Sequence, residues 1–170
     1  MALITEDGTA RSDAESLCTL AAANTYHANR GNAAWAALAS DNAREQMLRR
    51  ATDYMEAVYR ERWAGMRKTV SQALAWPRYY VPVRDVAVMQ YYPDNTVPAA
   101  VSNACAELAL RAISGSLAPD IKRLVKRVKV DTLETEYADN ATPYTRFRAI
   151  DLMLQPFLSG SDMNIRLVRA

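Results

Sequence analysis

The stretch DNAREQMLRRATDYMEAVYRERWAG, residues 41–65, decides the fold. Apolar side chains recur in it at the period of an α-helix and form one stripe: Met47, Leu48, Ala51, Tyr54, Met55 and Val58. On the other face, two glutamates each precede an arginine by four residues, in the pairs Glu45–Arg49 and Glu56–Arg60. Because that order of charges stabilises a helix by about 0.2–0.5 kcal/mol per pair, we predict a long, half-buried helix from Asp41 to Gly65.

Shorter helices are predicted before this one. Thr19 can cap a helix over residues 20–30 that ends at Gly31, since a hydroxyl suits the first position and glycine the residue after the last turn. Asn32 can then cap a short helix in AAWAALA. The polar, small residues 1–18 predict an extended N-terminal arm.

Two more helices are predicted in the second half of the chain. Pro98 fits the first turn of a helix that ends at Gly115. Its stripe consists mainly of small residues: Val101, Cys105, Leu108 and Ala112. Thr142 and Pro143 introduce the last helix, which Pro156 ends or kinks. One face of it is apolar: Phe147, Ile150, Leu154, Phe157 and Leu158.

The segments between and after these helices complete the predicted architecture. Residues 66–97 are proline-rich but also rich in Tyr and Val, which indicates a long ordered connection. Residues 121–137, IKRLVKRVKVDTLETEY, predict a strand or hairpin. The fold class is therefore mainly α: a helical bundle over residues 19–158 with a small β-hairpin and extended terminal arms, the second arm being the tail 159–170.

Composition favours one folded domain of modest charge. The chain has 170 residues, half of them hydrophobic, and a net charge of +2, too small to imply nucleic-acid binding by itself. Arginine outnumbers lysine by 17 to 4 among the 21 cations, which suits subunit interfaces and phosphate contacts, although a coding bias explains it equally well. Cys18 and Cys105 fit buried free thiols of a reducing cytoplasm better than a disulfide. The N-terminus lacks a signal-peptide pattern, and no apolar run is long enough to span a bilayer.

The inventory of reactive residues argues against catalysis. His27 is the single histidine, and with two distant cysteines it cannot make a four-ligand zinc site without carboxylates. Motifs for nucleotide phosphates, serine hydrolases and zinc proteases are missing from the sequence. We therefore expect a protein that is not an enzyme, with no catalytic residue, metal or cofactor.

One cationic cluster has two interpretations. It comprises Lys122, Arg123, Lys126, Arg127 and Lys129. As a phosphate-tracking patch it would bind DNA in a salt-dependent way. As a solvated face it would be balanced by the acidic residues that follow, Asp131, Glu134 and Glu136.

The stretch QALAWPRYY, residues 72–80, has three interpretations. The first is a rigid corner in which Pro77 holds Trp76 out of the helical region and the indole packs on the long helix. The second is a set of subunit-interface residues, because Trp, Tyr and Arg are common interface anchors; the candidates are Trp76, Arg78, Tyr79 and Tyr80. The third is base stacking, which needs an aromatic platform in a basic groove.

Several motifs in order resemble one known family. They are TYHANRGNAAWAAL (25–38), LRRATDYMEAVYRERWAGMR (48–67), QALAWPR (72–78), ACAELALRAISG (104–115) and PDIKRLVKRVKVDTLETEY (119–137). Together they resemble the head–tail connector, or adaptor, proteins of tailed bacteriophages, whose relatives are often labelled DnaT-like single-stranded-DNA-binding proteins. The family usually has a glycine before the acidic strand, where this chain has Asp131.

This resemblance implies a structural protein of the virion, made in the host cytoplasm. The expected partners are further copies in a ring of about twelve, a portal protein, a tail or stopper protein, and double-stranded DNA in the channel, with no membrane. The cationic cluster would line the channel, and the C-terminal tail would dock on the portal through Ile165, Arg166, Leu167, Val168 and Arg169. The alternative function is a replication-type module that binds single-stranded DNA.

Overall fold

The computed structural model describes residues 2–120, 127–130, 133–136 and 146–159. Within these ranges the helices are α1 (Leu20–Ala28), α2 (Ala33–Ala36), α3 (Asp41–Tyr59), α4 (Ala99–Ala112) and α5 (Arg148–Leu154), with 3₁₀ turns η1 (Arg60–Arg62) and η2 (Gln155–Phe157). Short strands form three antiparallel pairs: β1 (Met66–Arg67) with β2 (Arg78–Tyr79), β3 (Pro82–Val83) with β4 (Gln90–Tyr91), and β5 (Arg127–Val130) with β6 (Leu133–Glu136). The fold is mainly α with small β pairs, as predicted from the sequence.

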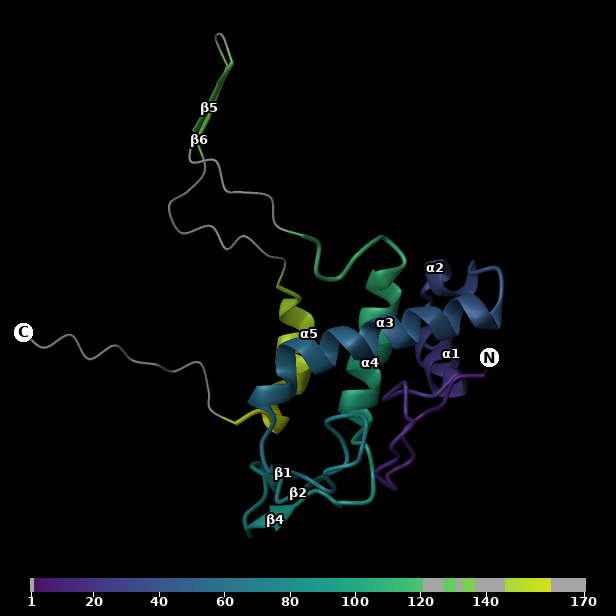
Figure 1. Ribbon diagram of the computed structural model, residues 1–170, viewed down its shortest axis with the longest axis vertical. Coiled ribbons are helices and arrows are strands. Elements are labelled where there is room, and N and C mark those ends of the chain that lie inside the picture. The colour runs from purple at the N-terminus through teal and green to yellow at the C-terminus, as the bar shows by residue number, and fades with distance from the viewer. Residues whose placement is uncertain (1, 121–126, 131–132, 137–145, 160–170) are drawn as a thin grey trace, which may run out of the picture.

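Helix α3 crosses α4 at the centre of the molecule, with α5 beside them (Figure 1). Helices α1 and α2 lie toward one end of α3, and strands β1 to β4 gather near the start of α4. Polar contacts tie α3 to α4 and α5. Arg50 donates to the carbonyls of Ala112, the last residue of α4, and of Gly115 beyond it, and the Tyr59 hydroxyl donates to Asp151 on α5 at 2.7 Å.

The buried face of α3 is shifted from the predicted stripe. Its buried residues are Leu48, Ala51, Thr52, Met55 and Tyr59, whereas Met47 and Tyr54 are half-buried and Val58 is exposed. Thr52 is tolerated in the core because its hydroxyl accepts from the Leu17 amide at 3.3 Å and lies 3.4 Å from the Cys105 sulfur. The small-residue stripe of α4 is buried as predicted, so α3 and α4 approach closely.

Several helix ends differ from the prediction. Helix α3 ends at Tyr59 rather than Gly65, because the chain tightens into η1 and then forms the turn that reaches β1. Gly65 has φ +69°, and a side chain there would collide with the Tyr79 carbonyl. Thr19 and Ser40 cap α1 and α3 through their hydroxyls, at 3.1 and 3.2 Å from the amides they accept.

The N-terminal segment is not the extended arm expected from its composition. Residues 2–18 fold back on the domain, where Ala14, Leu17 and Cys18 join the core. The Glu6 carboxylate organises the turn by accepting from the amides of Gly8, Ala10 and Arg11. Small residues and one acid satisfied by backbone donors therefore allow a polar segment to be buried.

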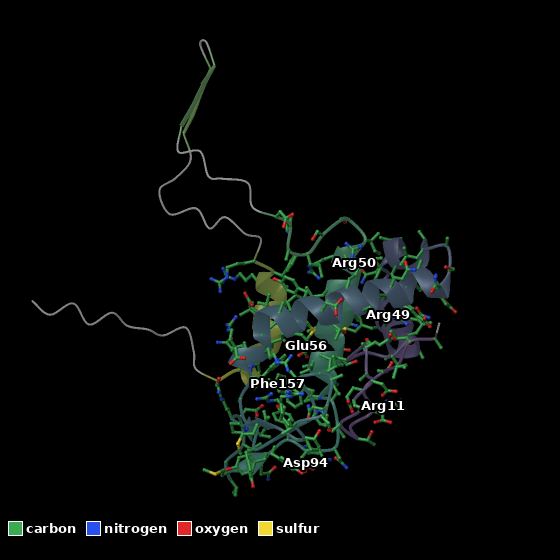
Figure 2. The ribbon with its side chains drawn as sticks, viewed as in Figure 1. Arg11, Arg49, Arg50, Glu56, Asp94 and Phe157 are labelled. Carbon is green, nitrogen blue, oxygen red and sulfur yellow. The ribbon has the colours of Figure 1, made fainter. Side chains whose placement is uncertain are left out.

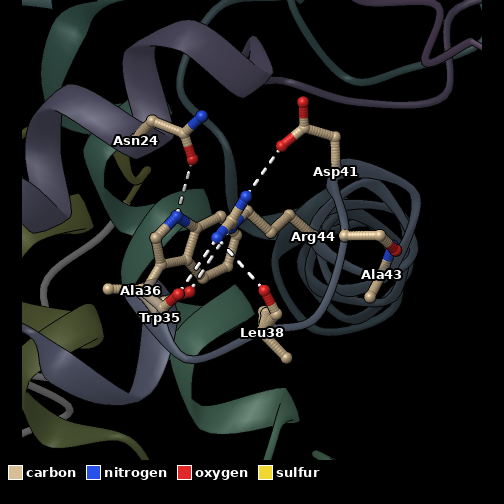
Figure 3. A network of polar contacts seen from close by, with 8 residues as sticks. Asn24, Trp35, Ala36, Leu38, Asp41, Ala43 and Arg44 are labelled. Atoms are coloured by element: carbon tan, nitrogen blue, oxygen red, sulfur yellow. Dashed lines mark hydrogen bonds and ion pairs between the residues drawn. The ribbon is translucent and has the colours of Figure 1, made fainter.

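The helical corner α1–α2–α3 is fixed by Arg44 (Figure 3). Its guanidinium donates to the carbonyls of Trp35, Ala36 and Leu38 and to the Asp41 carboxylate, the last at 2.7 Å. The buried Trp35 indole donates to Asn24 at 2.8 Å. This network joins α1, α2 and α3, and its polar side chains find their hydrogen-bond partners within the corner.

The shifted face of α3 gives a stability test. Replacing the fully buried Met55 by Ala (Met55→Ala) is expected to lower the free energy of unfolding by about 2–5 kcal/mol, because it removes buried contacts and leaves a cavity. Replacing the exposed Val58 by Ala should cost less than about 1 kcal/mol. Urea unfolding measures both, and equal losses would contradict the face assignment.

Candidate nucleic-acid interface

The stretch 72–80 forms a packed corner between α3 and the strands. Trp76 is fully buried, and its ring meets the rings of Trp63 and Phe157 edge-on at 5.6 and 5.9 Å. Phe157 lies at the end of the α5 segment, next to the strand region (Figure 2). Trp76 is therefore an internal corner residue, as the first interpretation predicts: its ring partners are Trp63 and Phe157, and it belongs to the same core cluster as the buried residues of α3.

Arg78 is also buried, which removes it from the candidate subunit interface. Its guanidinium donates to the carbonyls of Ala64, Ala75 and Gly65 at 2.8, 3.1 and 2.8 Å. These bonds satisfy carbonyls of the turn between α3 and β1, at Ala64 and Gly65, and of the loop before β2, at Ala75. Burial and the neighbouring Arg67 lower the pKa of Arg78. Trp76 and Arg78 are therefore internal residues of the corner, and neither offers a surface to another subunit.

Glu56 of α3 supplies the negative charge beneath this corner. It accepts from the Ala75 amide at 2.7 Å, and its second oxygen, which has no hydrogen-bond partner, forms an ion pair with Arg60 at 3.6 Å. Arg67 and Arg78 are opposite each other in the β1–β2 ladder, and both act on Glu56. Burial raises the pKa of Glu56, and the Ala75 hydrogen bond and the nearby arginines only partly oppose that rise.

Three tyrosines cluster on the outer side of the strands. The rings of Tyr79 and Tyr80 lie 6.0 Å apart, and Tyr80 meets Tyr91 edge-on at 5.8 Å. Tyr80 is 62% exposed and Tyr91 50%. Tyr80 has φ +58°, a left-handed conformation that interrupts strand alternation and keeps its ring beside Tyr79. We call Tyr79, Tyr80 and Tyr91 the tyrosine platform.

Lys68 lies on the same side as the platform. Met66 is opposite Tyr79 in the ladder, and the Lys68 amide donates to the Pro77 carbonyl at 3.3 Å, which continues the pairing by one residue. Alternation places Lys68 on the face of Met66 and Tyr79. Its ammonium makes no ion pair within the ranges that the structure describes. By alternation, the half-buried Lys68 belongs to the same face of the strand pair as Tyr79.

Most of the predicted DNA-channel residues lie outside the part of the chain that the structure describes. Lys122, Arg123 and Lys126 are outside the described residues, as are all five predicted portal-docking residues, 165–169. Arg127 and Lys129 belong to β5, where the register places them opposite Glu136 and Glu134.

The residues considered for catalysis and redox chemistry are structural in the described part of the chain. His27 is buried; its Nε2 donates to the Ala106 carbonyl at 3.1 Å, and its Nδ1 accepts from Asn32 at 2.9 Å. Burial lowers the pKa of His27, which suits this neutral form. Cys18 and Cys105 are buried free thiols. Among the described residues no group of three or more His, Cys, Asp and Glu is placed to hold a metal ion, and no helix there is long and apolar enough to cross a membrane.

An exposed group of aromatic rings on a mainly helical domain is a surface on which nucleic-acid bases can stack. The family of putative DnaT-like single-stranded-DNA-binding proteins matches the chain over residues 1–170, and the chain belongs to this family. No curated protein and no solved structure matches the chain.

The family corrects the functional expectation. The head–tail adaptor interpretation, with its virion role, is wrong, because the matching family is one of single-stranded-DNA binding and supports the alternative function instead. The ring, portal and tail partners were implied by that adaptor resemblance and have no support.

Sequence reasoning missed Tyr91 and Lys68. A signal for Tyr91 was present, since MQYYP at residues 89–93 is a second stretch with paired tyrosines and a proline, separated from the end of RYY by eight residues. The pairing of β3 with β4 that brings it to Tyr80 is a tertiary feature, however.

Glu56 gives a prediction about pH. Its pKa in the folded protein is raised above the ordinary 4.5, so the folded state binds the proton more tightly than the unfolded chain. Its stabilising contribution is fully present below that ordinary value and is lost as the pH rises through the raised pKa. Replacing Glu56 by Gln (Glu56→Gln) removes this loss, so the stability of the variant relative to the original chain should increase from acid to neutral pH.

Urea unfolding at a series of pH values measures this difference. The matched control is Glu61→Gln, at an exposed residue of the adjoining η1 turn, whose curve should run parallel to that of the unaltered protein. If the stability of Glu56→Gln relative to the unaltered protein stayed constant or fell as the pH rises, the raised pKa assigned to Glu56 would be contradicted.

Proposed function

We propose that the chain binds single-stranded DNA by stacking bases on the tyrosine platform, in a role that involves no catalysis. The observation that carries the proposal is the exposed cluster of Tyr79, Tyr80 and Tyr91 on a member of a single-stranded-DNA-binding family. Exposed aromatic rings stack on any base, and each such contact contributes about 1–3 kcal/mol.

The platform suits single strands better than duplex DNA. In a duplex the faces of the bases are covered by their neighbours, so rings at a protein surface reach them only in an unstacked strand. The platform has few groups placed for reading base edges, and base identity is read mainly by hydrogen bonds to those edges. Binding is therefore expected to discriminate strand number more than sequence.

The packed corner beneath the platform explains how the rings are held in position. Arg78 and Tyr79 are adjacent, so the hydrogen bonds that fix the buried guanidinium also fix the backbone of β2. Less conformational freedom is then lost when a base stacks, and pre-ordered side chains bind more tightly for the same contacts. Lys68 on the same face would contact the phosphates between stacked bases.

Removing the platform tests the proposal. Y80A/Y91A is expected to weaken binding of a fluorescent oligothymidylate about 30-fold or more, because two stacking contacts are lost. Y80F/Y91F should bind nearly as the unaltered protein does, since phenylalanine retains the ring. Fluorescence anisotropy measures both, and Leu152→Ala, at an exposed apolar residue of α5, is the matched control.

Two results would contradict the proposal. The first is unchanged affinity of the double alanine variant with an unchanged fold by circular dichroism. The second is equal affinity of the unaltered protein for single-stranded and duplex DNA of the same length.

Lys68 gives a separate prediction on salt dependence. Lys68→Ser should make the slope of log K against log salt concentration shallower by about 0.7, the value for one phosphate contact on a single strand. Lys68→Arg should keep the slope, because the charge is retained. A slope that Lys68→Ser leaves unchanged would remove Lys68 from the interface without affecting the stacking role.

A further inference from the structure

The exposed apolar surface of the chain is concentrated around the strands. Ten large apolar side chains are exposed among the described residues, and eight of them lie within residues 66–91. The tyrosine platform accounts for three. The aliphatic residues at the tip of the β3–β4 hairpin are a different kind of surface, since they have no π-face on which a base can stack.

The hairpin tip comprises residues 84–89, RDVAVM, between the paired residues Val83 and Gln90. All six residues are exposed, and Val88 and Met89 are 70% and 79% exposed. A solvent-exposed group of two valines and a methionine at one tip is costly in water and is typical of a protein contact. The tip is therefore a candidate interaction surface, and it adjoins the platform where the Tyr91 hydroxyl donates to the Met89 sulfur at 3.4 Å.

The charges at the tip identify the partner. Arg84 and Asp85 are adjacent, exposed and opposite in sign. One guanidinium nitrogen of Arg84 donates to the Leu158 carbonyl at 2.7 Å, and neither residue makes an ion pair in the part of the chain that the structure describes. A two-fold axis passing between two such residues brings Arg84 of one copy against Asp85 of the other, and the same contact forms a second time. The tip is thus complementary to itself.

We propose that a second copy of this chain docks on the hairpin tip through a two-fold contact. Val86, Val88 and Met89 form its apolar centre, and the two Arg84–Asp85 pairs form its charged rim, the usual arrangement of an interface. Such a contact closes at two copies, so it gives a dimer and does not propagate into a ring or filament.

The contact is small, so the dimer of the free chain is weak. Stable interfaces bury about 1,200–2,000 Å² in total, and one hairpin tip per copy provides less. Two copies on one DNA strand would meet at a high effective concentration, which makes a weak contact useful. The dimer itself does not depend on DNA binding and is testable without DNA.

The test is a charge exchange measured by sedimentation equilibrium in the absence of DNA. The unaltered protein should show a monomer–dimer equilibrium weaker than about 1 μM. R84D alone and D85R alone each place like charges across the axis and should weaken self-association about tenfold or more. An equal mixture of R84D and D85R should restore dimers, since each variant then meets its complement.

A second variant guards against local effects on folding. Arg84 also donates to the Leu158 carbonyl at 2.7 Å, so thermal unfolding of R84D is recorded alongside. V88S/M89S leaves that bond in place and should also abolish the dimer. The proposal is overturned by an unaltered protein that stays monomeric at all concentrations, by dimers that V88S/M89S leaves unchanged, or by a mixture that associates no better than its components. If Y80A/Y91A failed to affect DNA binding, the proposal of a dimer would be unaffected, because it is tested without DNA.

Discussion

The buried guanidinium of Arg78 is the interaction on which the strand region depends. After η1 the chain must turn from a helix into a two-residue strand, and the carbonyls of this turn are buried without partners in any ladder. Arg78 supplies several donors in one rigid plane and binds Ala64, Gly65 and Ala75 together. The Glu56 carboxyl of α3 accepts from the Ala75 amide at 2.7 Å, so the helix and the loop before β2 meet in the same polar cluster. The buried charge of Arg78 is tolerated because its guanidinium nitrogens donate to carbonyl oxygens at 2.8–3.1 Å.

This cluster separates the inner face of the strands from the outer face. On the inner face, Arg67 and Arg78 face the body of the domain, and Trp76 packs on the aromatic rings of Trp63 and Phe157. On the outer face, Met66 and Tyr79 are exposed, the half-buried Lys68 follows them by alternation, and the left-handed backbone of Tyr80 adds its ring. The strands therefore hold the fold together through their inner face and present, on their outer face, the surface that we propose binds DNA.

The sequence predicted elements better than it predicted surfaces. The long helix at residue 41, the small-residue stripe of α4 and the corner at Trp76 all follow from local periodicity, capping or proline chemistry. Two features could not be predicted in this way. The buried face of α3 depends on Thr52, whose polarity is hidden by contacts with residues far along the chain. Arg78 resembled an interface anchor because its true acceptors exist only in the folded turn. The functional expectation was also wrong. The motifs that suggested a head–tail adaptor occur in a chain whose matching family is described as single-stranded-DNA-binding.

The central claim is that bases contact the tyrosine platform. The most direct measurement is photo-crosslinking of the protein to an oligonucleotide containing a halogenated uracil, followed by mass spectrometry of the crosslinked peptides. The account predicts crosslinks at Tyr79, Tyr80 or Tyr91 that disappear when unlabelled single-stranded DNA competes. Crosslinks confined to the helical corner of α1 and α2, with none on β2 or β4, would contradict it.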